Sequence, residues 1–79
     1  MPDVPASSEL REFLHRHDLT GRAAARIVGV EPRTVRKWAA TEGTDNARSI
    51  PWSAWALLRL YVGELSLEDF REMVAPPRA

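Results

Sequence analysis

The chain has 79 residues, in which 11 lysines and arginines balance 11 aspartates and glutamates, and it contains no cysteine. This length gives one domain with a modest core, to which a second copy of the chain is expected to add. The missing cysteines exclude disulfides, thiolate zinc sites and a cysteine nucleophile.

Neither a membrane segment nor a metal site is evident. No apolar run reaches the roughly 18 residues of a membrane span, and the first residues lack the order of a signal peptide, so we expect a soluble, intracellular protein. His15 and His17 are two positions apart, and on a helix such residues point in different directions rather than at one metal ion. We expect no cofactor and no small-molecule ligand.

The neutral total conceals an uneven distribution of charge. Residues 1–14 carry a net −2 and residues 49–79 a net −1, whereas residues 15–48 carry seven cations against four acids, a net +3. A cluster of this kind is usually a solvated helix face, so charge alone does not identify a nucleic-acid partner. The spacing of the residues must show whether this segment binds nucleic acid.

The first two predicted helices cover residues 8–17 and 21–28. Ser8 is the expected cap of the first, which repeats apolar side chains at helical spacing. Thr20 is the expected cap of the second, and Gly29 can take the left-handed conformation that ends a helix. The alanines of this second helix permit close approach by another helix.

The third predicted helix covers residues 32–40 and begins with Pro32, where a missing N–H costs nothing. Its two sides differ in character. One side carries Val35, Trp38 and Ala39, and the other carries Arg33, Arg36, Lys37 and Ala40. Trp38 is expected in the core, because a tryptophan on the same side as Val35 is more often buried than stacked on a base.

A loop over 41–50 is followed by predicted helices over 52–63 and 66–75 and a tail over 76–79. The fourth helix is apolar on more than one side, which is more apolar surface than one face of a small domain covers. Ser66 and Asp69 resemble a capping box at the start of the fifth. Its apolar residues are expected to face inward, namely Leu67, Phe70, Met73 and Val74. With five helices and no strand, the predicted fold is all-α, in a single domain.

The second and third helices have the spacing of a helix-turn-helix. Counting from Gly21, a small residue is fifth, glycine is ninth, and aliphatic residues are tenth and fifteenth, at Ala25, Gly29, Val30 and Val35. The small residue leaves room for the crossing helix, the glycine makes the turn, and the two valines fix both helices to the core.

On these residues, over Leu19 to Trp38, the chain resembles helix-turn-helix regulators of the lambda-repressor and Cro type, particularly compact phage- and plasmid-borne repressors. It is similar in size and layout to the small autorepressors that accompany anti-CRISPR genes. The resemblance implies a DNA-binding transcriptional repressor in the cytoplasm of a bacterial or phage-infected cell. It further implies that the third helix enters the major groove and that the start of the second lies on the phosphate backbone.

The resemblance also implies which residues contact the bases of the DNA and which contact its phosphates. Base contacts are expected from Arg33, Arg36, Lys37 and Pro32, with Lys37 equally suited to a phosphate. Phosphate contacts are expected from Thr20, Gly21, Arg22, Thr34, Asn46 and Arg48. Glu31 departs from the pattern; it either accepts from a cytosine amino group or caps the helix poorly and turns away, and we favour the second reading. Arg26 is expected to be a surface or salt-bridging residue.

One recognition helix supports only weak binding, so we expect a homodimer that reads an inverted repeat with half-sites about 34 Å apart. The expected interface is Trp52, Trp55, Leu58, Tyr61 and Val62, with the alternative that most of them complete the monomer core. An enzyme is not expected, because no phosphate loop, paired carboxylates or triad is recognisable. The alternative function is a protein-interaction module, such as an antitoxin or inhibitor subunit, on a helix-turn-helix scaffold.

Overall fold

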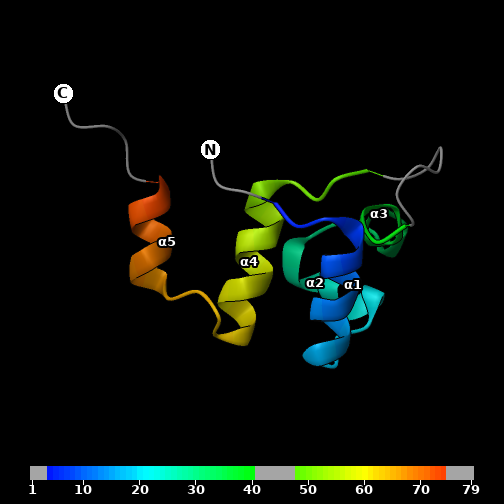
Figure 1. The fold of residues 1–79 in the computed structure, drawn as a ribbon, viewed down its shortest axis with the longest axis horizontal. Coiled ribbons are helices and arrows are strands. Elements are labelled where there is room, and N and C mark those ends of the chain that lie inside the picture. Colours follow the sequence, from blue (N-terminus) through cyan, green and yellow to red (C-terminus); the bar gives the residue numbers. More distant parts are fainter. Residues whose placement is uncertain (1–3, 41–47, 75–79) are drawn as a thin grey trace.

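Five α-helices in sequence form the fold of this computed structural model, which describes residues 4–40 and 48–74 (Figure 1). The helices are α1 Ser7–Arg16, α2 Gly21–Val28, α3 Pro32–Trp38, α4 Trp52–Val62 and α5 Leu67–Val74. The described residues contain no strand, which confirms the all-α prediction. None of the helices in this part of the chain has the length and apolar character needed to cross a membrane.

Three helix ends show why the helices begin and stop where they do. Thr20 caps α2, because its hydroxyl accepts from the Ala23 N–H at 3.0 Å, and Ser66 does the same for α5 with the Asp69 N–H at 3.0 Å. Gly29 ends α2 with a φ of 76°, the left-handed conformation expected of it.

The start of α1 corrects the expectation for Ser8. The helix begins one residue earlier, at Ser7, so the cap position belongs to Ala6, whose side chain has no acceptor atom. A different contact is present at this helix start, since Glu9 Oε1 accepts from the Ala6 N–H at 3.3 Å. This bond is the half of a capping box that the carboxylate supplies, and it occurs here without a serine or threonine at the cap position.

The core lies where α1, α2, α3 and α4 meet. Its buried members are Leu10, Phe13, Leu14, Ala24, Ala25, Val35, Trp38, Ile50, Ala54 and Leu58. α2 makes the closest approaches, to α3 and α4, and it does so through alanines that leave room for its neighbours. Each large side chain buried here contributes roughly 1.5–3 kcal/mol of apolar transfer.

A charged cluster ties the end of α1 to the turn between α4 and α5. Arg16 Nη2 lies 3.1 Å from Glu64 Oε2, and His17 Nε2 hydrogen-bonds the same oxygen. The hydrogen bond from His17, followed by that from Arg16, lowers the pKa of the Glu64 carboxyl from its ordinary value. All these groups are at the surface, so the cluster is a weak tether rather than a major source of stability.

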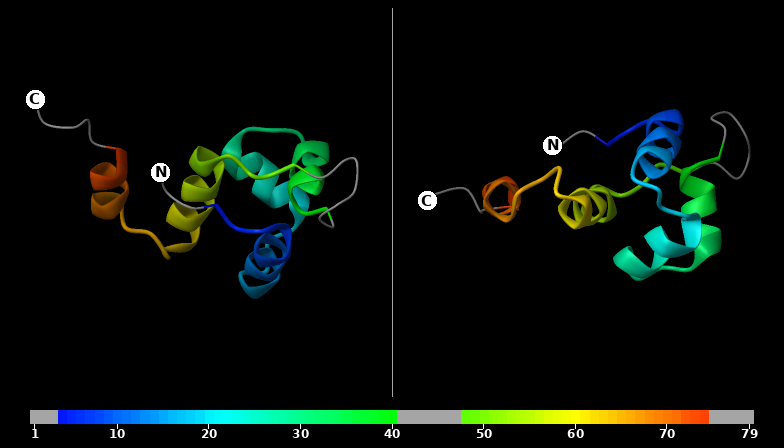
Figure 2. Two further views of the ribbon diagram at one scale, coloured as in Figure 1. Left: turned by 45° about the horizontal axis from the view of Figure 1, so that its top comes forward. Right: turned by 90° about the horizontal axis from the view of Figure 1, so that it is seen from below.

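α5 stands apart from this body at one end of the molecule (Figures 1 and 2). None of its residues is buried. Its closest helical neighbour is α4, and the ring of Phe70 stacks on Trp52 with the centroids 5.9 Å apart and the planes 7° from parallel.

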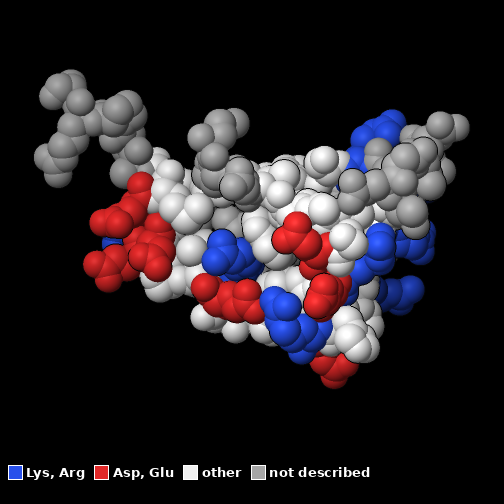
Figure 3. Space-filling view, in the orientation of Figure 1, with Lys and Arg blue, Asp and Glu red and all other residues white. Residues whose placement is uncertain are grey.

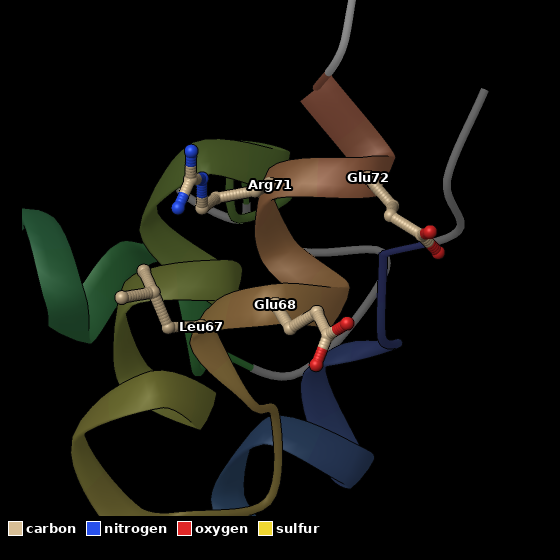
Figure 4. A pocket seen from close by; sticks show the side chains of 4 residues that line it. All are labelled: Leu67, Glu68, Arg71 and Glu72. Atoms are coloured by element: carbon tan, nitrogen blue, oxygen red, sulfur yellow. The ribbon is translucent and has the colours of Figure 1, made fainter.

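The expectation that the apolar residues of α5 face inward is therefore wrong for three of the four. Leu67 is 63 % exposed, Met73 40 % and Val74 47 %. A single neighbouring helix covers only a narrow strip of α5, which is enough for Phe70 alone. Beside this helix lies a shallow hollow lined by Leu67, Glu68, Arg71 and Glu72 (Figure 4).

Candidate nucleic-acid interface

The crossing of α2 and α3 is set by the short turn between them. The N–H groups of Gly29 and Val30 both donate to the carbonyl of Ala25, at 2.8 and 3.0 Å, which closes the end of α2. Pro32 then begins α3 at a position where no hydrogen bond is lost. The structure thus has two short helices joined by a short turn, with α3 as the second helix.

Small and aliphatic residues hold the two helices against each other. Val35 is 2 % exposed, Val30 packs against the same core, and Ala25 is fully covered. A methyl group added at Gly21 would lie 3.9 Å from Val35 Cγ1, so the start of α2 runs close beside α3. These are the roles that the spacing predicted for Ala25, Val30 and Val35.

The outward side of α3 gathers three cations. Arg33, Arg36 and Lys37 are exposed and line one open hollow together with Ala40. None of the three forms a salt bridge with any residue that the structure describes. Figure 3 shows basic side chains at the α3 end of the molecule and acidic ones over α5 at the other.

Trp38 belongs to the opposite side of the same helix. It is 6 % exposed and packs in the core with Val35, which confirms the expectation that it is a core residue rather than a base-stacking one. With its apolar side anchored and its cationic side exposed, α3 presents charge outward from a fixed base.

The N-terminal end of α3 carries the remaining candidates for groove contact. Pro32 and Thr34 are half-buried. Glu31 occupies the cap position but its side chain makes no cap hydrogen bond, as expected of a poor cap. Its exposed carboxylate therefore does not cap α3.

The start of α2 offers backbone donors beside a basic side chain. Thr20 Oγ1 satisfies the Ala23 N–H, and the carbonyl of Thr20 accepts the first intrahelical bond from Ala24. The N–H groups of Gly21 and Arg22 belong to the first turn, where helix geometry provides no acceptor. With the exposed Arg22 side chain, they form a helix start suited to an anion.

Of the two loop candidates, Arg48 can be placed and Asn46 lies outside the described residues. The backbone N–H of Arg48 donates to the carbonyl of Lys37 at 3.1 Å, so Arg48 is held beside the last turn of α3. Arg26, at the end of α2, is exposed.

Sequence analysis did not single out Arg11, whose Nη1 donates to the carbonyl of Ala39 at 2.6 Å, across 28 positions of sequence. No local pattern marks this residue, because a side chain that reaches another helix has no characteristic spacing. Its neighbours Leu10 and Glu12 only indicate an exposed position on an amphipathic helix.

Of the residues expected at a dimer interface, the structure buries some in the core and leaves others exposed. Leu58 is 1 % exposed and belongs to the core, so it has no surface to offer a second copy. Trp55 packs its ring edge-on against Phe13, with centroids 4.8 Å apart, and Val62 also packs against the core. Trp52 lies against α5, and Tyr61 remains 65 % exposed.

Known proteins provide an independent comparison. Two curated relatives, each described as the transcriptional repressor protein KorC of Escherichia coli, match most of the chain. The first is 44 % identical over 62 residues, which cover 75 % of this chain and 67 % of the relative. The second is 47 % identical over 57 residues, 68 % of this chain and 61 % of the relative. No family model matches the chain, and no solved structure is significantly similar to it.

Proposed function

This chain belongs to the KorC family of transcriptional repressors, and from that premise we propose that it represses transcription as a homodimer bound to double-stranded DNA. The observation that carries the proposal is the exposed cationic side of α3, which stands on a buried apolar base and has no salt-bridge partner among the described residues. We place the protein in the bacterial cytoplasm, where an operator would be accessible.

In this proposal α3 lies in the major groove and reads base edges. Arg33 and Arg36 are the principal readers, because a guanidinium can bond both O6 and N7 of guanine, a pairing worth about 1–3 kcal/mol of discrimination. Lys37, near the end of the helix, contacts either a base or a phosphate. Pro32 lies at the groove edge, where its ring can contact a thymine methyl group.

Phosphate contacts orient the helix without reading sequence. We assign them to the start of α2, through Thr20, Gly21 and Arg22, to Thr34 of α3, and to Asn46 and Arg48 in the segment that follows α3 in the sequence. The open N–H groups of the first turn of α2 favour an anion for the same reason that helix starts bind phosphate in general.

The second copy of the chain docks, in this proposal, on the α4–α5 end. Exposed large apolar side chains are concentrated there, at Leu57, Tyr61, Leu67, Met73 and Val74. Tyr61 is the strongest anchor, since tyrosine is enriched among interface residues and this one is largely uncovered. A twofold axis at this end leaves the α3 helices of both copies uncovered, as the reading of two half-sites requires.

Selection of bound duplexes from a random DNA pool at about 150 mM salt tests the proposal directly. We expect an inverted repeat whose half-sites contain guanine, with occupancy of a promoter blocking transcription sterically. Recovery of no consensus would refute sequence-specific binding. It would favour the protein-interaction alternative, for which the exposed apolar residues of α4 and α5 are the evident contact surface.

A further inference from the structure

The C-terminal end of α3 is built differently from the ends of its neighbours. α2 and α4 both stop at a glycine in the left-handed conformation, Gly29 with φ 76° and Gly63 with φ 85°. α3 stops at Ala39, with φ −94° and ψ 0°, so it lacks the left-handed residue found at those two ends, and the bond that closes its last turn, from the Ala40 N–H to the Lys37 carbonyl, is long at 3.4 Å.

Donors from elsewhere in the chain supply what the missing glycine would have provided. The Arg48 N–H bonds the carbonyl of Lys37, and the Arg11 guanidinium bonds the carbonyl of Ala39. The Arg11 contact, at 2.6 Å, comes from a side chain on α1. A cation at a helix C-terminus also interacts favourably with the helix dipole.

This contact matters because α3 is short and its core anchors are on the side opposite the cations. The helix has seven residues, and isolated helices of that length are unstable in water. Its core anchors are Val35 and Trp38, which point away from the cationic side. Arg36 and Lys37 belong to the last turn, so any movement of that turn displaces them directly.

We propose that Arg11 is a positioning residue for DNA recognition, which holds the last turn of α3 in the orientation that base reading needs. The inference rests on the proposed DNA-binding function. To read a guanine, an arginine must make two hydrogen bonds with good geometry at the same time. A small rotation of α3 would therefore weaken discrimination between DNA sequences, while the attraction between the cations and the phosphates would remain.

Arg16 provides a matched control on the same helix. It is also exposed, carries the same charge and makes one polar contact, but it bonds Glu64 beside the α4–α5 turn rather than α3. Arg16→Met therefore removes an equivalent side chain and an equivalent charge from α1 without touching the end of α3.

The test compares binding of Arg11→Met, Arg11→Lys and Arg16→Met to two duplexes, the one selected by the wild-type protein and a scrambled one. For Arg11→Met we expect the Kd for the selected duplex to rise about 3- to 10-fold, as the loss of one hydrogen bond implies, with the Kd for the scrambled duplex unchanged. Arg11→Lys should recover part of the loss, because an ammonium group can donate to the same carbonyl. Arg16→Met should preserve the ratio of the two affinities.

Two results would overturn the inference. Equal weakening on both duplexes, with a salt dependence reduced by about one phosphate contact, would make Arg11 a phosphate ligand instead. Unchanged binding by Arg11→Met would make its contact with Ala39 irrelevant to recognition.

Hydrogen exchange of the free protein separates this inference from the function on which it rests. Arg11→Met should speed exchange of the α3 amides relative to Arg16→Met, at a temperature where both variants are folded. If the wild-type protein selects no duplex, the DNA-binding proposal fails whatever the exchange shows. If exchange in α3 does not change, the positioning role fails even when DNA binding is established.

Discussion

The two ends of the molecule use the same amphipathic pattern in opposite ways. At the α3 end the apolar side is buried and the exposed side is cationic, whereas at the α5 end no residue is buried and the exposed charges are mainly the acids Glu68, Asp69 and Glu72 (Figure 3). An amphipathic sequence therefore indicates which residues can be buried. Which of them are buried depends on the helices that pack against them. A polyanion is attracted to the first end and repelled by the second.

Charge reversal at the α3 end should weaken DNA binding more than any other change considered. Arg33→Glu combined with Arg36→Glu is expected to weaken DNA binding by at least about 2–6 kcal/mol, the value of two lost base contacts. Both side chains are exposed, so the midpoint of thermal unfolding should change little. Binding is measured by fluorescence anisotropy on the selected duplex.

The double variant Arg16→Glu, Arg26→Glu changes the net charge equally at exposed positions outside the surfaces assigned to DNA and to the second copy. It should retain much more affinity than the α3 variant. Equal losses in the two would show that binding follows total charge rather than the charge of one end.

Removal of a buried apolar side chain from the same helix should give the next largest effect, which is on the stability of the fold. Trp38→Ala should destabilise the fold by about 3–5 kcal/mol through the cavity that it leaves, a large part of the 5–15 kcal/mol typical of small proteins. Urea denaturation measures the change. Weaker DNA binding without a loss of stability would instead place the indole among the bases, contrary to its 6 % exposure.

The helices α2 and α3 and the turn between them could be predicted from sequence because their determinants are local. Gly29 ends α2, Pro32 begins α3, and the alternation between Val35 and the cations lies within one helix, so spacing alone specifies which side is covered. Thr20 and Ser66 cap their helices for similarly local reasons. The boundaries of α3 and α4 differ from expectation by only the last one or two residues.

Contacts between distant segments could not be predicted in the same way. The stripe of Leu67, Met73 and Val74 indicates a covered face, but no other helix of the described chain comes near enough to cover it. Leu58 is equally apolar and lies fully in the core. The contact from Arg11 to Ala39 depends on how α1 lies relative to α3, which no spacing within either helix encodes.

The third prediction tests whether the exposed apolar residues of α4 and α5 form the dimer interface. Tyr61→Asp should weaken self-association of the protein on the order of 1–2 kcal/mol, because a charge would have to be buried where an aromatic ring was. The monomer should keep its stability, since Tyr61 is 65 % exposed. Sedimentation equilibrium gives the dimer Kd.

Tyr61→Phe is the matched control, since it keeps the ring and removes only the hydroxyl group. Dimerisation should survive this change. A wild-type protein that stays monomeric at tens of micromolar and on DNA would remove the dimer from the proposal, and the α5 end would then need another partner.

The smallest expected effect concerns the tether between the end of α1 and the α4–α5 turn, which is formed by Glu64 with Arg16 and His17. Because these contacts lower the pKa of the Glu64 carboxyl below its ordinary value of 4.5, the folded protein binds this proton less readily than the unfolded chain does. The stabilisation is present above the unfolded pKa and is lost as pH falls through the lower, folded one. The thermal midpoint of the wild type should thus fall more steeply than that of Glu64→Gln between about pH 5 and pH 3.

Glu12→Gln removes the same charge from an exposed carboxyl that has no salt bridge to the described residues, so it should keep the wild-type slope. The difference between the wild type and Glu64→Gln is expected to be small because the Arg16 and Glu64 side chains are near solvent, where screening weakens ion pairs. Added salt should reduce it further. Identical slopes in the wild type and Glu64→Gln at low salt would mean that α1 and the α4–α5 turn are held together by packing alone.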